Sequence, residues 1–189
     1  MKLSHIPGSI RYQCGNSIYS FLSTGDIYRF ESGPIMINGF TGTKKEGSAN
    51  NIWLRIYRED SSENGIAYYP LLGIRSASRL IQDSNCLKYY GEIHKISYEV
   101  TFIPSTSAWF WEVNLTPAED ARTVDLIYGQ DLGMADKTSL LDNELYTAQY
   151  LGHTVLKDTY GYHICSRQNL AQSTGFPYIH QGILNAGAI

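Results

Sequence analysis

Residues 125–169 read DLIYGQDLGMADKTSLLDNELYTAQYLGHTVLKDTYGYHICSRQN, and they decide the fold class. Segments in which apolar and polar residues alternate with a period of two are typical of strands, and turns and a short polar segment lie between them. Many of the polar side chains that could bind a ligand, such as Gln130, Asp131 and Asp136, fall in these connections. Binding residues tend to lie on loops that a rigid sheet holds in place. The stretch therefore predicts a β-sheet that carries polar loops.

The same pattern continues through the rest of the chain. Residues 1–17 are expected to be a lead-in, and one helix of a turn or two is expected at 137–141. In 52–58, the side chains of Ile52, Leu54 and Ile56 should share one face, and those of the intervening residues the other. The other expected strands are 17–22, 27–30, 35–38, 87–93, 96–103, 108–115, 123–128 and 162–165. Short strands separated by turns predict a single all-β, mainly antiparallel sandwich domain over residues 1–189.

The bulk properties restrict the class of protein. The chain has 189 residues, 43% hydrophobic and 17% charged, with a formal net charge of −3, which is typical of one globular domain. The longest basic run is Lys44 and Lys45, so we expect no nucleic-acid partner. No segment has the pattern of a signal peptide or a membrane span, so we expect a cytoplasmic protein without a membrane partner. Three scattered cysteines predict neither a disulfide framework nor a zinc site.

Aromatic residues are unusually frequent, with 15 Tyr, 6 Phe and 3 Trp. Tyr and Trp are favoured in strands, so these rings can fill a core and cover sheet faces. They can also form a surface on which sugars stack, because each ring has a flat apolar face. Trp109 and Trp111 share one strand face, which both interpretations require.

Several polar residues suggest chemistry without establishing it. Asp131, Asp136 and Glu144 could supply the paired carboxylates of a glycoside-cleaving enzyme, but Asp beside a glycine turn commonly caps backbone N–H groups instead. His163 and Cys165 stand two residues apart on one strand, and with His153 they could be imagined as metal ligands. Ordinary strand residues are the favoured interpretation, and no metal is predicted.

A second polar cluster comprises Arg167, Gln168 and Asn169, with Gln172 nearby. Planar guanidinium and amide groups form directional hydrogen bonds, as recognition of sugar hydroxyls requires. The same groups can tie a loop to a neighbouring domain, which is the favoured alternative.

Six segments occur in an order that resembles the N-terminal sandwich domain of the cellobiose phosphorylase family, glycoside hydrolase family 94. The blocks GQDLG and SRQN are the most specific, and the 1,2-β-oligoglucan phosphorylase and cyclic β-1,2-glucan synthase branch is the most similar. The matching segments are 25–30 (GDIYRF), 35–40 (IMINGF), 46–57 (EGSANNIWLRIY), 128–136 (YGQDLGMAD), 143–150 (NELYTAQY) and 161–169 (GYHICSRQN).

The resemblance implies a galactose-mutarotase-like super-β-sandwich at the head of a longer enzyme, here incomplete at its C-terminal end. The family cleaves β-glucosides with inorganic phosphate and releases α-glucose 1-phosphate, with inversion of configuration at the anomeric carbon. Phosphate is a co-substrate, and no cofactor is implied. The general acid lies in a following α/α barrel that these residues do not include, so no catalytic residue transfers. The implied partners are a β-linked gluco-oligosaccharide, the barrel of the same polypeptide and a second subunit. Expected cleft-bordering residues are Gln130, Asp131, Asp136, Arg167, Gln168 and Asn169.

Two alternatives remain open at this point. A free-standing carbohydrate-binding module would use Trp53, Trp109 and Trp111 as stacking platforms. An aldose-epimerase-like enzyme would use Glu144 with His153 or His163 as general base and acid. In all three cases, the segment 181–189 is expected to end the chain without a closing strand.

Overall fold

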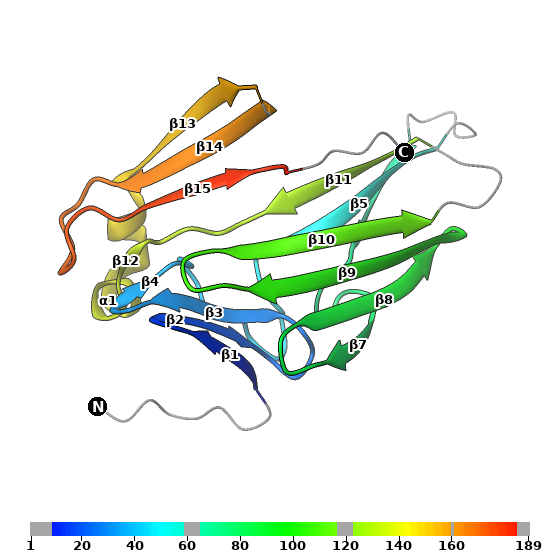
Figure 1. Cartoon of the computed structure of the whole chain (residues 1–189), viewed down its shortest axis with the longest axis horizontal. Coiled ribbons are helices and arrows are strands. Elements are labelled where there is room, and N and C mark those ends of the chain that lie inside the picture. Colours follow the sequence, from blue (N-terminus) through cyan, green and yellow to red (C-terminus); the bar gives the residue numbers. More distant parts are fainter. Residues whose placement is uncertain (1–8, 59–64, 117–122, 160, 185–189) are drawn as a thin grey trace. The chain divides into compact units, whose positions relative to one another are not determined.

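The computed structural model describes residues 9–58, 65–116, 123–159 and 161–184 (Figure 1). Among them, antiparallel strands predominate, which confirms the predicted all-β class. The strands are β1 (Ile10–Cys14), β2 (Ser17–Phe21), β3 (Ile27–Ser32), β4 (Ile35–Met36), β5 (Asn51–Arg58), β6 (Gly65–Pro70), β7 (Arg79–Gln82), β8 (Leu87–Ile93), β9 (Ile96–Pro104), β10 (Trp109–Thr116), β11 (Val124–Gly129), β12 (Ala135–Asp136), β13 (Leu151–Asp158), β14 (Gly161–Gln168) and β15 (Tyr178–Gly182), and the helix is α1 (Lys137–Ala148).

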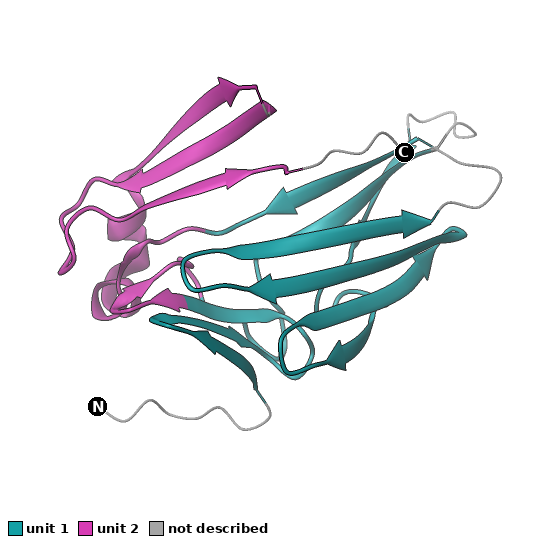
Figure 2. Ribbon diagram, viewed as in Figure 1, with its two compact units in different colours: residues 1–30, 41–131 teal, residues 31–40, 132–189 magenta. Residues whose placement is uncertain are grey.

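The described strands form four sheets, with the orders β1-β2-β3-β4-β12, β10-β9-β8-β7, β11-β5-β6 and β13-β14-β15. The chain divides into two compact units, coloured separately in Figure 2. The first unit contains residues 1–30 and 41–131, and the second contains residues 31–40 and 132–189. The single sandwich domain over residues 1–189 stays a prediction.

An aromatic core holds the first unit together. The rings of Phe21 and Phe102 lie 4.8 Å apart between centroids, Phe102 and Trp111 lie 4.9 Å apart, and Phe30 and Trp109 lie 5.3 Å apart. Strands β2 and β3 therefore pack their rings against those of β9 and β10. Edge-to-face and tilted ring pairs of this kind add to the stabilisation that burial of their area provides. Trp109 and Trp111 thus belong to the core face, one of the two interpretations of their spacing.

Strand β1 corrects the expectation that residues 1–17 are only a lead-in. Ile10 and Tyr12 are buried, and β1 pairs along its whole length with β2. The Tyr12 hydroxyl donates hydrogen bonds to the backbone oxygens of Asp83 (3.1 Å) and Cys86 (2.6 Å). The alternation in this strand covers only five residues, too few to stand out in the sequence, and its long-range partners stabilise it.

We expect the stability of the chain to fall as the pH rises from about 10 to about 12. Burial, and then the nearby Cys86 and Asp83, raise the pKa of Tyr12 to about 12, whereas an unfolded Tyr titrates near 10. The unfolded state therefore loses its proton first, and stability present below pH 10 is lost through this range. Urea unfolding at a series of alkaline pH values measures the loss. Tyr12→Phe should lose less stability over the same range, and an equal loss would contradict this assignment.

The second unit is built on short elements. Met36 of β4 pairs with Ala135 of β12, and these two residues and Leu140 form a buried apolar cluster. Helix α1 is longer than the predicted 137–141, with a non-helical Asn143 (φ −159°, ψ 81°) inside it. The Asn143 side-chain oxygen accepts a hydrogen bond from the Tyr146 N–H (3.1 Å), as an N-cap residue does. The prediction found the first helical segment and missed the second, which Asn143 starts.

Five further strands, β6, β7, β12, β13 and β15, have no counterpart among the expected strand ranges. Strand β6 pairs with β5, and the four-residue β7 pairs with β8. Strand β15 pairs with β14 and includes Gln181 and Gly182, so the expectation that 181–189 contributes no strand is wrong for its first two residues. Residues 185–189 lie outside the described part of the chain.

Candidate functional site

The six residues predicted to border a cleft fall into both units. Gln130 and Asp131 belong to the first unit, and Asp136, Arg167, Gln168 and Asn169 belong to the second. Each group has its own hydrogen-bond environment. That these residues border a substrate cleft stays a prediction.

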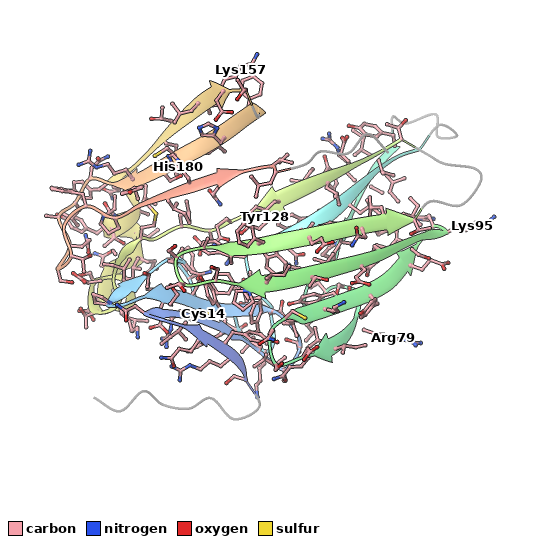
Figure 3. The ribbon with its side chains drawn as sticks, in the orientation of Figure 1. Cys14, Arg79, Lys95, Tyr128, Lys157 and His180 are labelled. Atoms are coloured by element: carbon pink, nitrogen blue, oxygen red, sulfur yellow. The ribbon has the colours of Figure 1, made fainter. Side chains whose placement is uncertain are left out.

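Gln130 and Asp131 follow the end of β11. The hydroxyl of Tyr128, a residue labelled in Figure 3, donates to Gln130 Oε1, and Gln130 Nε2 donates to the Asp131 backbone oxygen (3.2 Å). The Asp131 N–H donates to Asn50 Oδ1 (2.6 Å), and Asn50 is itself buried. These bonds link the GQDLG block to the loop before β5, so two of the segments that resemble the phosphorylase family meet here.

Asp136 connects the start of α1 to a later loop. Its carboxylate accepts hydrogen bonds from the Ser173 N–H (2.7 Å) and the Ser173 hydroxyl, and its own N–H donates to Gln172 Oε1 (2.8 Å). This is the loop-binding role that the sequence offered as the alternative to catalysis. A shallow pocket of about 420 Å³ lies beside these groups, lined by Pro34, Asp136, Lys137, Thr138 and Ser173.

Gln168 is fully buried, whereas its two neighbours in the sequence are exposed. Its Nε2 donates to the backbone oxygens of Gly133 and Thr147 (both 3.1 Å), and its Oε1 accepts from the Leu170 N–H (3.0 Å). Both amide hydrogens are therefore used inside the protein. Burial and these partners give Gln168 a structural role in the second unit.

Arg167 and Asn169 present their side chains differently from Gln168. The Arg167 guanidinium lies over the Phe176 ring, 5.1 Å from its centroid, and the Asn169 backbone N–H donates to the Tyr150 oxygen (2.9 Å). Both side chains are exposed. Of the SRQN block, they are the two residues still available to a ligand or a neighbouring domain.

The two histidines proposed as alternative partners of Glu144 in an epimerase, His153 and His163, both lie in the β13-β14-β15 sheet. His153 pairs with Ser166, and its Nδ1 lies 2.8 Å from the Ser166 hydroxyl. His163 lies near Asp158 and stacks beside His180, with ring centroids 5.6 Å apart. Because side chains alternate along a strand and directly paired residues share a face, His153 and His163 project from opposite faces. Within the described ranges, no group of three or more His, Cys, Asp or Glu residues could hold a metal ion.

The β11-β5-β6 sheet carries a charged cluster that the sequence interpretation missed. Arg55 Nε donates to Asp125 Oδ2 (2.9 Å), Arg55 Nη2 donates to the same oxygen, and so does the Tyr57 hydroxyl (2.8 Å). The hydrogen bonds from Arg55, and then those from Tyr57, hold the pKa of Asp125 below its usual value. Asp125 is far from the other two in the sequence, so the strand pairing was needed to find the cluster.

The comparisons with known proteins concern nearly the whole chain. Residues 20–189 match the family model described as the SOGP N-terminal domain. A 1,2-β-oligoglucan phosphorylase from Listeria innocua is 29% identical over 165 residues, which are 87% of this chain and 14% of that relative. This chain thus spans a small part of the relative's length. The part of the chain that the structure describes contains no helix long and apolar enough to cross a membrane. The chain belongs to the SOGP N-terminal domain family.

Proposed function

We propose that this chain is the N-terminal, non-catalytic domain of an inverting glycoside phosphorylase of glycoside hydrolase family 94. The enzyme would cleave β-glucosides, with β-1,2-glucan oligosaccharides as the favoured class, and use phosphate to release α-glucose 1-phosphate. The family match over residues 20–189 carries this proposal. The similarity to an oligoglucan phosphorylase over 87% of the chain supports the choice of substrate class.

In this proposal the domain acts as a scaffold, a dimer contact and a wall of the catalytic cleft. The geometry of the predicted cleft residues supports a wall better than acid–base catalysis. The Asp136 carboxylate is occupied by two donors from Ser173, and the Gln168 amide is buried against backbone groups. Such bonds fix loops in position, as a surface that orients a substrate requires.

Phosphorolysis by the complete gene product tests the proposal. The complete gene product should release α-glucose 1-phosphate from β-1,2-gluco-oligosaccharides and phosphate. The 189-residue chain alone should release none, and α-linked malto-oligosaccharides are the matched substrate control. Release of sugar phosphate by the 189-residue chain would overturn the non-catalytic role. Absence of release from every β-linked glucan by the complete product would overturn the phosphorylase assignment.

A free-standing carbohydrate-binding module is the second candidate, and one observation favours it. The rings of Trp109 and Trp111 pack against Phe30 and Phe102, so core packing accounts for the spacing of these two residues. Trp53, however, lies on the half-exposed face of β5, and the buried side chain of Leu54 lies on the other face of the same strand. Sugar binding by the 189-residue chain, without phosphorolysis by the complete product, would favour this candidate.

A further inference from the structure

We propose that the outer face of the β11-β5-β6 sheet is a binding surface for a neutral β-linked gluco-oligosaccharide, formed by Trp53, Arg55, Tyr57, Tyr68 and Asp125. We call these five residues the β5 platform. The choice of glucan as ligand rests on the proposed function. The surface itself is argued from the geometry of the first unit alone.

Strand register places the platform residues together. Arg55 of β5 lies directly opposite Asp125 of β11 and Tyr68 of β6, so these three side chains form one row across the sheet. Trp53 and Tyr57 flank Arg55 on the same face, because residues two apart along a strand point the same way. The intervening positions of β5 are fully or almost fully buried, so the platform lies on the outer face.

The Trp53 indole reaches from β5 to Gly129 of the neighbouring strand β11. A Cβ atom built on Gly129 would be only 2.6 Å from Trp53 Cζ3 and 3.1 Å from Cη2, so the six-membered ring covers the space where a side chain at 129 would project. The absence of a side chain at Gly129 allows this arrangement. Aromatic faces are the surfaces against which the apolar faces of sugars pack, and the half-buried Trp53 ring is such a surface on this sheet.

The charges of the platform cancel one another. Three donors converge on Asp125 Oδ2, two from Arg55 and one from Tyr57. The side chains of Arg55 and Asp125 nevertheless keep 30% and 39% of their surface exposed. A guanidinium has five N–H groups and a carboxylate has two oxygens, so directional donors and an acceptor remain for a ligand. A neutral ligand rich in hydroxyl groups complements such a surface, whereas a polyanion or polycation finds no net charge to bind.

The rings extend the platform on either side of this ion pair. The Arg55 guanidinium lies over the Tyr57 ring, 5.2 Å from its centroid, and Tyr68 is 54% exposed. Trp53 and Tyr57 are four residues apart in an extended strand, a span of about 13 Å. This elongated row of aromatic and hydrogen-bonding groups suits a short oligosaccharide better than a single sugar.

Isothermal titration of the 189-residue chain with β-1,2-gluco-oligosaccharides tests the inference. Saturable binding is expected, with no binding of the anionic polysaccharide polygalacturonate. Trp53→Ala should weaken binding by about 10-fold or more, as loss of a stacking ring does in other ligand sites. Tyr178→Ala removes an exposed ring from β15 and is the matched control, with unchanged binding expected. Absence of saturable binding, or equal losses in the two variants, would overturn the inference.

Gly129→Ala provides a second test that removes no aromatic side chain. The added methyl group must displace the Trp53 ring, so binding should weaken by several-fold in the wild-type background. In the Trp53→Ala background, the same change should have no further effect, because the ring is already absent. Circular dichroism and urea unfolding show whether each variant stays folded. An equal effect of Gly129→Ala in both backgrounds would contradict a binding role for the Trp53 ring beside position 129.

Three further outcomes separate this inference from its alternatives. If Trp53→Ala converts a dimer to a monomer in analytical ultracentrifugation and leaves sugar binding unchanged, the face is a contact with a second copy, and the inference is overturned. If the chain binds no glucan while the complete gene product releases glucose 1-phosphate, the inference fails and the proposed function stands. If the chain binds glucan and the complete product releases none, the proposed function fails and the binding surface stands.

Discussion

Replacing Asp26 by Ala should lower the free energy of unfolding by about 3–5 kcal/mol. Asp26 is 3% exposed, and its carboxylate accepts three hydrogen bonds. Oδ2 accepts from the Thr24 hydroxyl (2.6 Å) and the Ile74 N–H (2.9 Å), and Oδ1 accepts from the Ser48 N–H (3.2 Å). Hydrogen bonds to a charged group contribute more than neutral ones, and the substitution leaves partly buried N–H groups without an acceptor.

Two glycines show how closely the surrounding loops fit this carboxylate. Gly47 and Gly73 have positive φ values of 79° and 77°, and a Cβ on either would lie within 2.6 Å of Asp26 Oδ1. Each loop therefore folds directly onto the carboxylate. Without Asp26, both loops lose the group around which their backbones are arranged.

Urea unfolding of the 189-residue chain measures the effect of the Asp26 change. Asp26→Asn should cost less than Asp26→Ala, because the amide keeps one acceptor oxygen. Asp83→Ala is the matched control: Asp83 is exposed, and its Oδ1 accepts hydrogen bonds from the N–H and the hydroxyl of the adjacent Ser84. The control should change stability by less than about 1 kcal/mol. Similar losses for Asp26→Ala and Asp83→Ala would contradict the role given to Asp26.

Replacing Gln168 by Ala should lower the free energy of unfolding by about 2–4 kcal/mol. The substitution removes three hydrogen bonds at a fully buried position and leaves the Gly133 and Thr147 oxygens without this donor. Thr147 lies near the end of α1, so Gln168 ties that end to β14. We therefore expect a substitution of Gln168 to lower the stability of the chain rather than to weaken ligand binding directly.

Arg167→Ala is the matched control for Gln168→Ala, because Arg167 is its exposed neighbour on β14. We expect Arg167→Ala to change the urea midpoint little and, in the complete gene product, to raise KM for the oligosaccharide if Arg167 borders the cleft. Gln168→Ala should shift the midpoint strongly and leave KM unchanged at a temperature where the variant is folded. The reverse pattern would restore Gln168 as a substrate-binding residue and contradict its structural role.

The sequence identified the strands that alternate clearly and missed those that do not. The expected strand 52–58 differs from β5 by one residue, and its division into a buried and an outer face is confirmed. Strand β7 has four residues, too few to establish a period, and β6 has six residues and ends with Pro70. Their partners in the sheets, rather than their own patterns, make them strands.

The candidate site was less predictable than the fold. Gln168 has the residue type of a sugar-binding side chain, yet its partners are backbone groups of Gly133 and Thr147, which no local spacing indicates. The Arg55–Asp125 pair joins two strands whose register cannot be derived from either segment alone. Spacing along a chain finds faces and turns, whereas the partners of a polar side chain depend on long-range pairing.

The pairing of the two-residue strand β4 with β12 also affects when the second unit can fold during synthesis. Met36 pairs with Ala135, and the buried Glu31 forms an ion pair with Lys137, so both residues belong to a unit completed only by much later parts of the chain. A ribosome adds about 5–20 residues per second, so roughly 5–20 s separate the two halves of this unit. During that interval the nascent chain exposes the edge of β4 while the first unit is being made. The number of residues between β4 and β12 therefore determines how long the edge of β4 can pair with a wrong strand during translation.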